Sequence, residues 1–106
     1  MAPRMTMATR VVLGTLLNDV EAEWFGSQIG RVAGLPSGTV HPILARLEGV
    51  GWVESRWEDI DPSTEGRPAR RYYRLTRSGA AQARQALAAA RRPMPGLAGT
   101  PKEGLS

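Results

Sequence analysis

The sequence predicts a mainly α-helical domain with a β-hairpin wing, that is, a winged helix-turn-helix followed by one C-terminal helix. Three observations predict it. Two short apolar-periodic segments are joined by a tight turn at residues 35–38. Two segments of strand character, 53–60 and 70–75, are separated by a loop rich in Asp, Ser, Pro and Gly. An alanine-rich helical segment then follows and ends at Pro93.

The first helix is expected over residues 8–19, because its apolar residues recur at helical spacing. They are Val12, Leu13, Leu16, Leu17 and Val20. Residues 1–7 have no such periodicity, and we expect them to form a flexible N-terminus. A second, short helix carries Phe25, Ile29, Val32 and Ala33, and Gly34 is well placed to end it.

The third helix is expected to begin with Ser37 as its N-cap and to end at Gly49 and Gly51. One apolar stripe runs along it, formed by Val40, Ile43, Leu44 and Leu47. Pro42 falls near the start, where a proline removes at most about one intrahelical hydrogen bond. Two short helices joined by a turn of this length form a helix-turn-helix.

The hairpin after the third helix is expected to pair residues 53–60 with 70–75 across a loop at 61–68. Strand alternation places Tyr73 with Leu75 on one side and Tyr72 on the other, and we expect Tyr73 in the core. Trp52 and Trp57 are interpreted as aromatic residues that close a thin core, in preference to the alternative that they line a pocket for an aromatic effector.

A last helix is expected at residues 77–91, capped by Thr76. The domain is therefore placed at residues 8–92. Residues 93–106 hold three prolines and three glycines, and a disordered tail is expected there.

Composition limits the function. The 106 residues fit one domain, and small domains of this kind often gain stability by dimerising. Cysteine is absent and His41 is the single histidine, which excludes thiol chemistry and argues against a transition-metal site or another cofactor. No nucleophile–base pair is visible, so no enzyme is expected. No segment is long enough for a membrane span. The apolar run at residues 11–17 superficially resembles a signal peptide, but it is short and no cleavage site follows it, so a cytoplasmic location is expected.

Charge is distributed very unevenly along the chain. The net charge is +4, and residues 66–92 contain eight arginines and no acid. Residues 19–61, in contrast, contain eight acids and three arginines. A basic segment next to a helix-turn-helix favours a polyanion partner, namely nucleic acid.

An ordered series of motifs resembles the PadR family of winged-helix transcriptional regulators, over roughly residues 10–80. These motifs are Trp24-Phe25-Gly26, residues 35–44, Leu47-Glu48, residues 51–58, Gly66-Arg67-Pro68, residues 71–76 and Gly79. The resemblance implies a dimeric DNA-binding repressor, often released by a small aromatic or phenolic effector. The chain departs from the family at His41, where tyrosine is usual. Its short C-terminal helix is that of the small subfamily, and the shares of helices 8–19 and 77–91 in the dimer interface stay open.

In such a protein the third helix enters the major groove of double-stranded DNA. Its hydrogen-bonding residues are Ser37, Thr39, His41 and Arg46. The positions opposite its apolar stripe are Gly38, Pro42, Ala45 and Gly49, whose side chains cannot read a base edge. Direct readout is therefore expected to be narrow. Ser37 and Thr39 can alternatively serve as cap hydroxyls, and Arg46 can pair with Glu48 or Glu54.

Further contacts are expected from the wing and from the second helix. Arg67, Arg70 and Arg71 are assigned to the minor groove or to phosphates, and Tyr72 to a phosphate. Gln28 and Arg31 are expected to reach the DNA backbone. The sequence thus predicts a sequence-specific DNA-binding regulator, a homodimer on an inverted-repeat operator. The alternative is a winged helix that binds only proteins, although its function would not require so many arginines.

Overall fold

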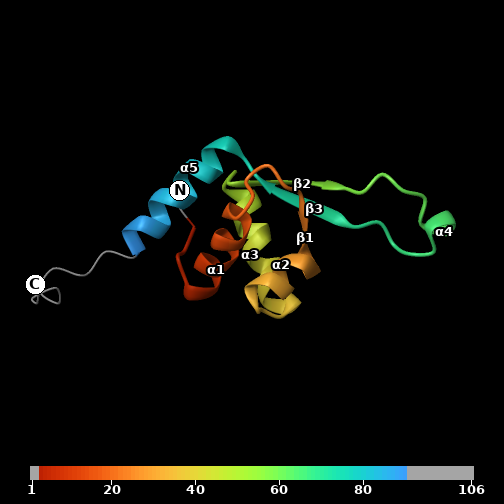
Figure 1. Ribbon diagram of the computed structural model, residues 1–106, viewed down its shortest axis with the longest axis horizontal. Helices are drawn as coiled ribbons and strands as arrows, with labels where there is room; N and C mark the ends of the chain where they lie inside the picture. Colours follow the sequence, from red (N-terminus) through yellow and green to blue (C-terminus); the bar gives the residue numbers. More distant parts are fainter. Residues whose placement is uncertain (1–2, 91–106) are drawn as a thin grey trace, which may run out of the picture.

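The computed structural model describes residues 3–90 and shows a helical body from which a long hairpin projects (Figure 1). Its helices are α1 (Met7–Leu17), α2 (Gly26–Ala33), α3 (Ser37–Gly49), α4 (Pro62–Glu65) and α5 (Arg77–Ala90). Its strands are β1 (Trp24–Phe25), β2 (Val53–Trp57) and β3 (Arg71–Leu75). The predicted winged helix-turn-helix with a C-terminal helix is confirmed. The tail expected at 93–106 lies outside the described residues.

The start of α1 is fixed by a threonine cap. The Oγ1 atom of Thr6 accepts a hydrogen bond from the Thr9 amide at 3.1 Å, which satisfies one of the amides left free at a helix start. The helix therefore begins at Met7 and ends at Leu17, two residues earlier than its apolar periodicity indicates. Val12, Leu13 and Leu16 of this helix are buried.

The sheet is antiparallel and has the strand order β1-β3-β2. β1 corrects the expectation that Phe25 belongs to the second helix. Phe25 has extended dihedral angles (φ −100°, ψ 157°), and its amide donates to Gln28 Oε1 at 3.3 Å, so α2 begins only at Gly26. Phe25 then pairs with Tyr72 at the open edge of β3.

The hairpin is longer than its two strands. Beyond Trp57 one more backbone bond, from the Glu58 amide to the Arg70 carbonyl, holds the strands together at 2.7 Å. The expected loop at 61–68 contains the single helical turn α4, which Asp61 caps by accepting from the Ser63 amide. α4 lies at the far end of the wing (Figure 1).

The core lies between the sheet and α1, α2 and α3. It includes Tyr73, with 8% of its surface exposed, and Leu75, as alternation in β3 predicts. Trp52 is buried, but Trp57 is 61% exposed, so its assignment to the core was wrong. Ser55 is the last β2 residue bonded to α3, through Glu48, and Trp57 lies one strand repeat beyond the end of that helix.

α5 is joined tightly to the sheet at its first turn. Thr76 Oγ1 accepts from the Gly79 amide at 2.9 Å and donates to the Gly51 carbonyl at 2.8 Å, which confirms the predicted cap. Gly79 is buried, and a Cβ there would collide with the Trp52 carbonyl oxygen. None of the described helices is long and apolar enough to cross a membrane.

We expect Gly79→Ala to lower the free energy of unfolding by ~2 kcal/mol or more, because backbone must move to admit the methyl group. Gly49→Ala is the control, since a Cβ at Gly49 has open space around it and should change stability by less than ~1 kcal/mol. Urea unfolding measures both. Equal effects of the two substitutions would contradict the close approach of α5 to Trp52.

Candidate nucleic-acid interface

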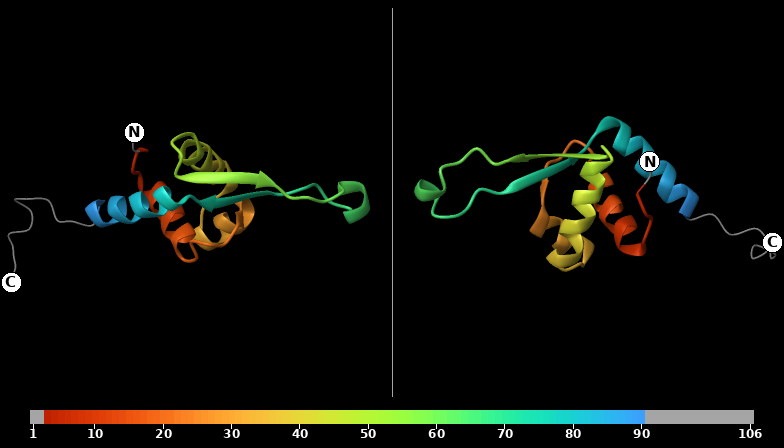
Figure 2. Two further views of the ribbon diagram at one scale, coloured as in Figure 1. Left: turned by 90° about the horizontal axis from the view of Figure 1, so that it is seen from above. Right: turned by 180° about the vertical axis from the view of Figure 1, so that it is seen from behind.

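α3 presents one face to solvent and the other to the core. Figure 2 (right) shows it in front of the sheet, with the wing projecting to one side. The exposed face carries Ser37, Gly38, His41, Pro42, Ala45, Arg46 and Gly49. The buried face consists of Val40, Ile43, Leu44 and Leu47, the predicted stripe. Three of the four predicted contact residues of α3, namely Ser37, His41 and Arg46, therefore lie on a helix face that is accessible to a ligand.

The first turn of α3 differs from its prediction in one respect. Pro36, with extended dihedral angles (φ −71°, ψ 154°), is the N-cap, and no side chain caps the helix. The Pro36 carbonyl accepts the amides of Thr39 and Val40 at 2.9 and 3.1 Å. Ser37 is thus the first helical residue, and its predicted role as N-cap was wrong. Within residues 3–90 the hydroxyls of Ser37 and Thr39 have no hydrogen-bond partner, which leaves them available to a ligand.

His41 is positioned by a glycine of α2. Its ring lies so close to Gly26 that a Cβ there would stand 2.7 Å from His41 Cε1. Gly26 is buried while His41 is exposed. The absence of a side chain at residue 26 therefore lets the imidazole lie along the start of α2, at the edge of the exposed α3 face.

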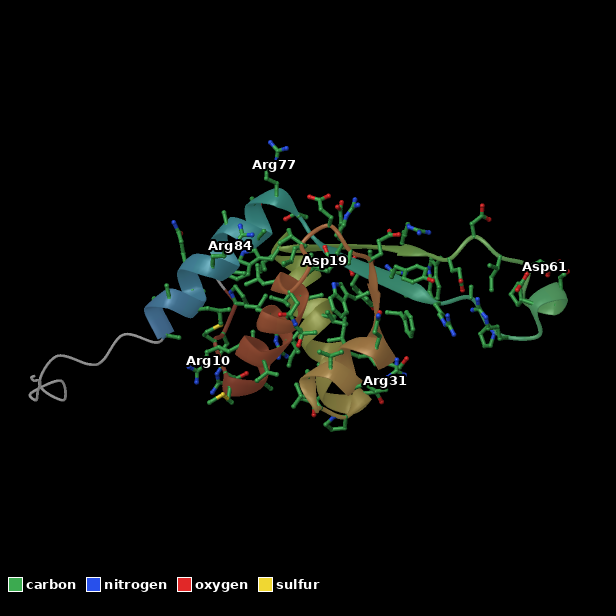
Figure 3. The ribbon with its side chains drawn as sticks, in the orientation of Figure 1. Arg10, Asp19, Arg31, Asp61, Arg77 and Arg84 are labelled. Atoms are coloured by element: carbon green, nitrogen blue, oxygen red, sulfur yellow. The ribbon has the colours of Figure 1, made fainter. Side chains whose placement is uncertain are left out.

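The two polar α2 residues differ in availability. Gln28 is half-buried, and its side-chain oxygen accepts the Phe25 amide, so it first serves to start α2. Arg31 is exposed and points outward at the lower edge of the helical body (Figure 3). Arg46 on α3 is also exposed, and its expected pairing with Glu48 or Glu54 is not found in the described structure.

Arg67 is held inside the wing by Glu58. The guanidinium donates two hydrogen bonds to the Glu58 carboxylate, at 2.7 and 2.9 Å. The same carboxylate accepts the Arg70 amide at 3.2 Å and the Tyr72 hydroxyl at 3.3 Å. These bonds, chiefly those from Arg67, lower the pKa of Glu58 to about 2 against an opposing effect of desolvation. Glu58 thus binds three residues of the wing to one another.

The remaining wing residues lie on opposite faces of β3. Arg71 stacks over the Trp57 ring, with its guanidinium carbon 5.0 Å from the ring centroid, and lies on the α3 side. Arg70 stacks over Phe25 at 4.6 Å, and Tyr72 meets the same ring edge-on at 6.0 Å. Neighbouring residues of a strand point to opposite faces. A DNA duplex that lies against one face of β3 therefore cannot contact both Arg71 and Tyr72 from that face.

The charges that are separated along the sequence are paired in space. The ion pairs of the described residues are Arg56–Glu23, Arg67–Glu58, Arg71–Glu48 and Arg74–Glu54. The wing tip is acidic, since Asp59, Asp61 and Glu65 all lie there and Asp61 occupies its far end (Figure 3). Within the described residues 66–90 the arginines therefore do not form a continuous positive face. Some of these arginines are held in ion pairs, whereas others have no such pair among the described residues.

The structure thus places Ser37, His41 and Arg46 on the exposed face of α3, leaves Thr39 half-buried, and puts Arg71 on the α3 side of the sheet. It places Arg70 and Tyr72 on the other side and commits Arg67 to Glu58. Sequence reasoning missed the exposed Trp57 beside Arg71. No local signal could have found it, because strand alternation puts Trp57 on the same face as the buried Val53, and its exposure depends on where α3 ends.

A winged helix with an exposed second helix in its helix-turn-helix defines a class of DNA-binding proteins. Residues 25–85 match the model of the Transcriptional regulator PadR-like family, and the chain belongs to that family. That family is one of transcriptional regulators. No curated protein sequence matches the chain.

Solved structures agree with this fold. AbfR of Staphylococcus epidermidis is 30% identical, with a TM-score of 0.62 over 82% of this chain and 53% of that one. Overoxidized AbfR bound to DNA is 29% identical, with a TM-score of 0.61 over 81% and 60%. BpsR of Bordetella bronchiseptica, whose DNA binding is regulated by 6-hydroxynicotinic acid, is 18% identical and shares the fold (TM-score 0.65, 82% and 56%). The chain spans less than two thirds of the length of each.

We expect Glu58→Gln to lower stability at neutral pH, because the amide cannot pair with the Arg67 charge. The lowered pKa of Glu58 means that its contribution is complete above about pH 5 and is lost as the pH falls towards about 2. The difference in urea midpoint between wild type and variant should therefore shrink on acidification. Glu65→Gln, on the same wing but without a hydrogen-bonded partner in the described chain, should show no such convergence. A pH-independent difference for Glu58→Gln would contradict the ion-pair account.

Proposed function

We propose that the protein is a sequence-specific repressor that acts in the cytoplasm as a homodimer on an inverted-repeat operator in double-stranded DNA. The observation that carries this proposal is the exposed face of α3, whose polar side chains are free while its apolar stripe is buried. The two-fold symmetry of such a dimer would be mirrored by the two half-sites of its operator.

Base readout in this proposal comes from the leading part of α3. Ser37, Thr39, His41 and Arg46 offer hydrogen-bonding groups, while Gly38, Pro42 and Ala45 let the helix backbone approach the groove closely. Four side chains read only a few base pairs in each half-site. Specificity therefore also depends on half-site spacing and on the deformability of the DNA.

The wing contributes through its stem and not through its tip in this proposal. Asp59, Asp61 and Glu65 at the tip repel phosphates, and Arg67 is occupied by Glu58. Arg70 and Arg71 lie at the outer end of the paired strands, and Glu58 does not bind their guanidinium groups. Gln28, Arg31 and Tyr72 are assigned supporting contacts to the DNA backbone.

Dimerisation is assigned to a groove between α1 and α5. Its lining is mostly apolar and comes from Met7, Val11, Gly14, Leu17, Leu87 and Ala88. Met7 is 65% exposed, and Arg10 Nε at the same groove is buried without a hydrogen-bond partner in the described structure. A second copy that covers the groove would bury its apolar residues and can supply an acceptor to Arg10. Both helices, α1 and α5, then share the interface.

Release of the DNA by a small aromatic effector belongs to the same proposal. The regulation of BpsR by 6-hydroxynicotinic acid supports it by likeness of fold alone. Titration of the protein–DNA complex with aromatic acids and phenols would test it, and loss of binding is the expected result.

The decisive experiment compares binding to the DNA upstream of the protein's own gene with binding to shuffled DNA over a range of salt. A preference of at least about 10³ for the upstream DNA is expected, with a salt dependence that reports several phosphate contacts. Equal affinities would contradict a sequence-specific regulator of its own gene. Absence of binding at low salt would instead favour a protein-interaction module.

Arg46→Ala is expected to weaken operator binding by about fivefold or more, which corresponds to the lower end of the ~1–3 kcal/mol for a base-contacting arginine. Arg77→Ala, at the start of α5, removes the same charge away from the exposed α3 face and is the matched control (Figure 3). Fluorescence anisotropy of labelled operator measures both. Equal losses would show that only net charge matters.

Leu87→Glu should convert a dimer to a monomer, because a carboxylate cannot be buried in an apolar seam without a partner. Val32→Glu changes an equally apolar residue that is 56% exposed on α2 and should leave the dimer intact. Sedimentation velocity distinguishes the two species. A dimer that survives Leu87→Glu but not Val32→Glu would place the seam on α2.

A further inference from the structure

Trp57 is the exposed member of the three tryptophans, all of which lie in the described part of the chain. Trp52 is 2% exposed and Trp24 is half-buried, whereas Trp57 is 61% exposed at the end of β2. A single exposed apolar residue needs no explanation by itself. Its surroundings, however, show a specific arrangement.

The indole of Trp57 is covered on one face by a cation. Arg71 lies directly opposite Trp57 in the antiparallel register, and its guanidinium carbon is 5.0 Å from the ring centroid. Arg71 Nη2 is also 3.8 Å from Glu48 Oε2, too far for a strong hydrogen bond. Glu48 Oε2 in turn accepts the Ser55 hydroxyl at 2.6 Å. The pair is thus fixed at the corner where the last turn of α3 meets the stem of the wing.

This corner lies on the α3 side of the sheet, beside the last turn of that helix. Trp57 shares its strand face with Ser55, which is bonded to α3, and Figure 2 (right) shows that helix in front of the sheet with the wing stem beside it. When α3 occupies a major groove and the wing extends alongside, the sugar–phosphate backbone between the grooves passes across this corner. A flat apolar ring beside a guanidinium is complementary to a deoxyribose beside a phosphate.

We propose that Trp57 and Arg71 form one contact to the backbone of double-stranded DNA. The indole packs against a deoxyribose, and Arg71 exchanges its weak interaction with Glu48 for the adjacent phosphate. The contact carries no sequence information and strengthens binding to all duplexes alike. This proposal rests on the proposed DNA-binding function of α3, and it adds to the DNA contacts Trp57, a residue that the sequence-based prediction of the site did not include.

The first test follows the accessibility of Trp57 in the full-length wild type. Acrylamide quenching of tryptophan emission is measured with and without a saturating duplex of mixed sequence at low salt, and binding is confirmed separately by anisotropy of the labelled duplex. DNA should protect the most accessible fraction of the emission. Trp57→Phe, which lacks that fraction, should show little protection. Bound DNA that leaves the quenching of wild type unchanged would overturn the contact but not the DNA-binding function.

The second test separates the ring from the charge. Trp57→Ala should weaken binding about tenfold for operator and shuffled DNA alike, as expected for the loss of roughly 60 Å² of apolar contact. Trp57→Phe should keep most of the affinity. Arg71→Gln should lower the salt slope, the dependence of log affinity on log salt concentration, by about one. Val32→Ala, an exposed apolar truncation on α2, is the control and should have no effect.

Each remaining outcome is decisive. A folded Trp57→Ala with affinity within twofold of wild type overturns the contact. If that variant does not fold, the quenching of wild type decides. An altered oligomeric state in Trp57→Ala with unchanged DNA affinity per dimer also overturns it, because the ring would then face a second copy. No DNA binding by wild type overturns this contact together with the proposed function.

Discussion

The antiparallel pairing of β2 with β3 is the constraint on which the rest of the structure depends. The register sets Trp57 opposite Arg71 and Glu54 opposite Arg74, so it decides at once which charges neutralise each other and which aromatic ring an arginine covers. It also divides β3 into a core face and an outer face. Because Tyr73 and Leu75 are buried against the helices, Arg71 lies on their face of the strand, and Tyr72 and Arg74 lie on the outer face.

Pairing within the hairpin changes the meaning of a basic composition. A net charge of +4 gives the impression of a broadly positive surface, yet Arg56, Arg67 and Arg74 are bound to the carboxylates of Glu23, Glu58 and Glu54. Exposed ion pairs of this kind add little stability, because solvent screens them and long side chains lose freedom. Their larger effect is to occupy four of the eleven arginines of residues 3–90, whereas Arg31 and Arg46 are among the seven that have no ion pair within those residues. Affinity for DNA then depends on where these remaining cations lie.

Much of the fold could be predicted from periodicity, because α1, α3 and the hairpin each bury a stripe or a face several residues long. The two-residue strand β1 could not, since no pattern exists over so short a segment and its pairing with Tyr72 is a long-range event. The N-cap of α3 was predicted one residue too late, at Ser37 instead of Pro36, because serine has the better capping side chain. Exposure of Trp57 depends on where α3 ends beneath β2, which local sequence does not determine. The partners of Arg67 and Arg71 depended on the strand register.

The acidic tip and the narrow α3 surface together indicate how such a small domain can be specific. A wing that inserted its tip into a groove would have to neutralise Asp59, Asp61 and Glu65, which Arg67 cannot do while it is bound to Glu58. In the proposed complex the tip therefore limits the wing to contacts near its stem and acts against a misplaced register on the DNA. With few base contacts in each half-site, the fixed distance between the two α3 helices of the proposed homodimer would be the main source of discrimination. The proposed seam between α1 and α5 would then set specificity as directly as any residue on α3.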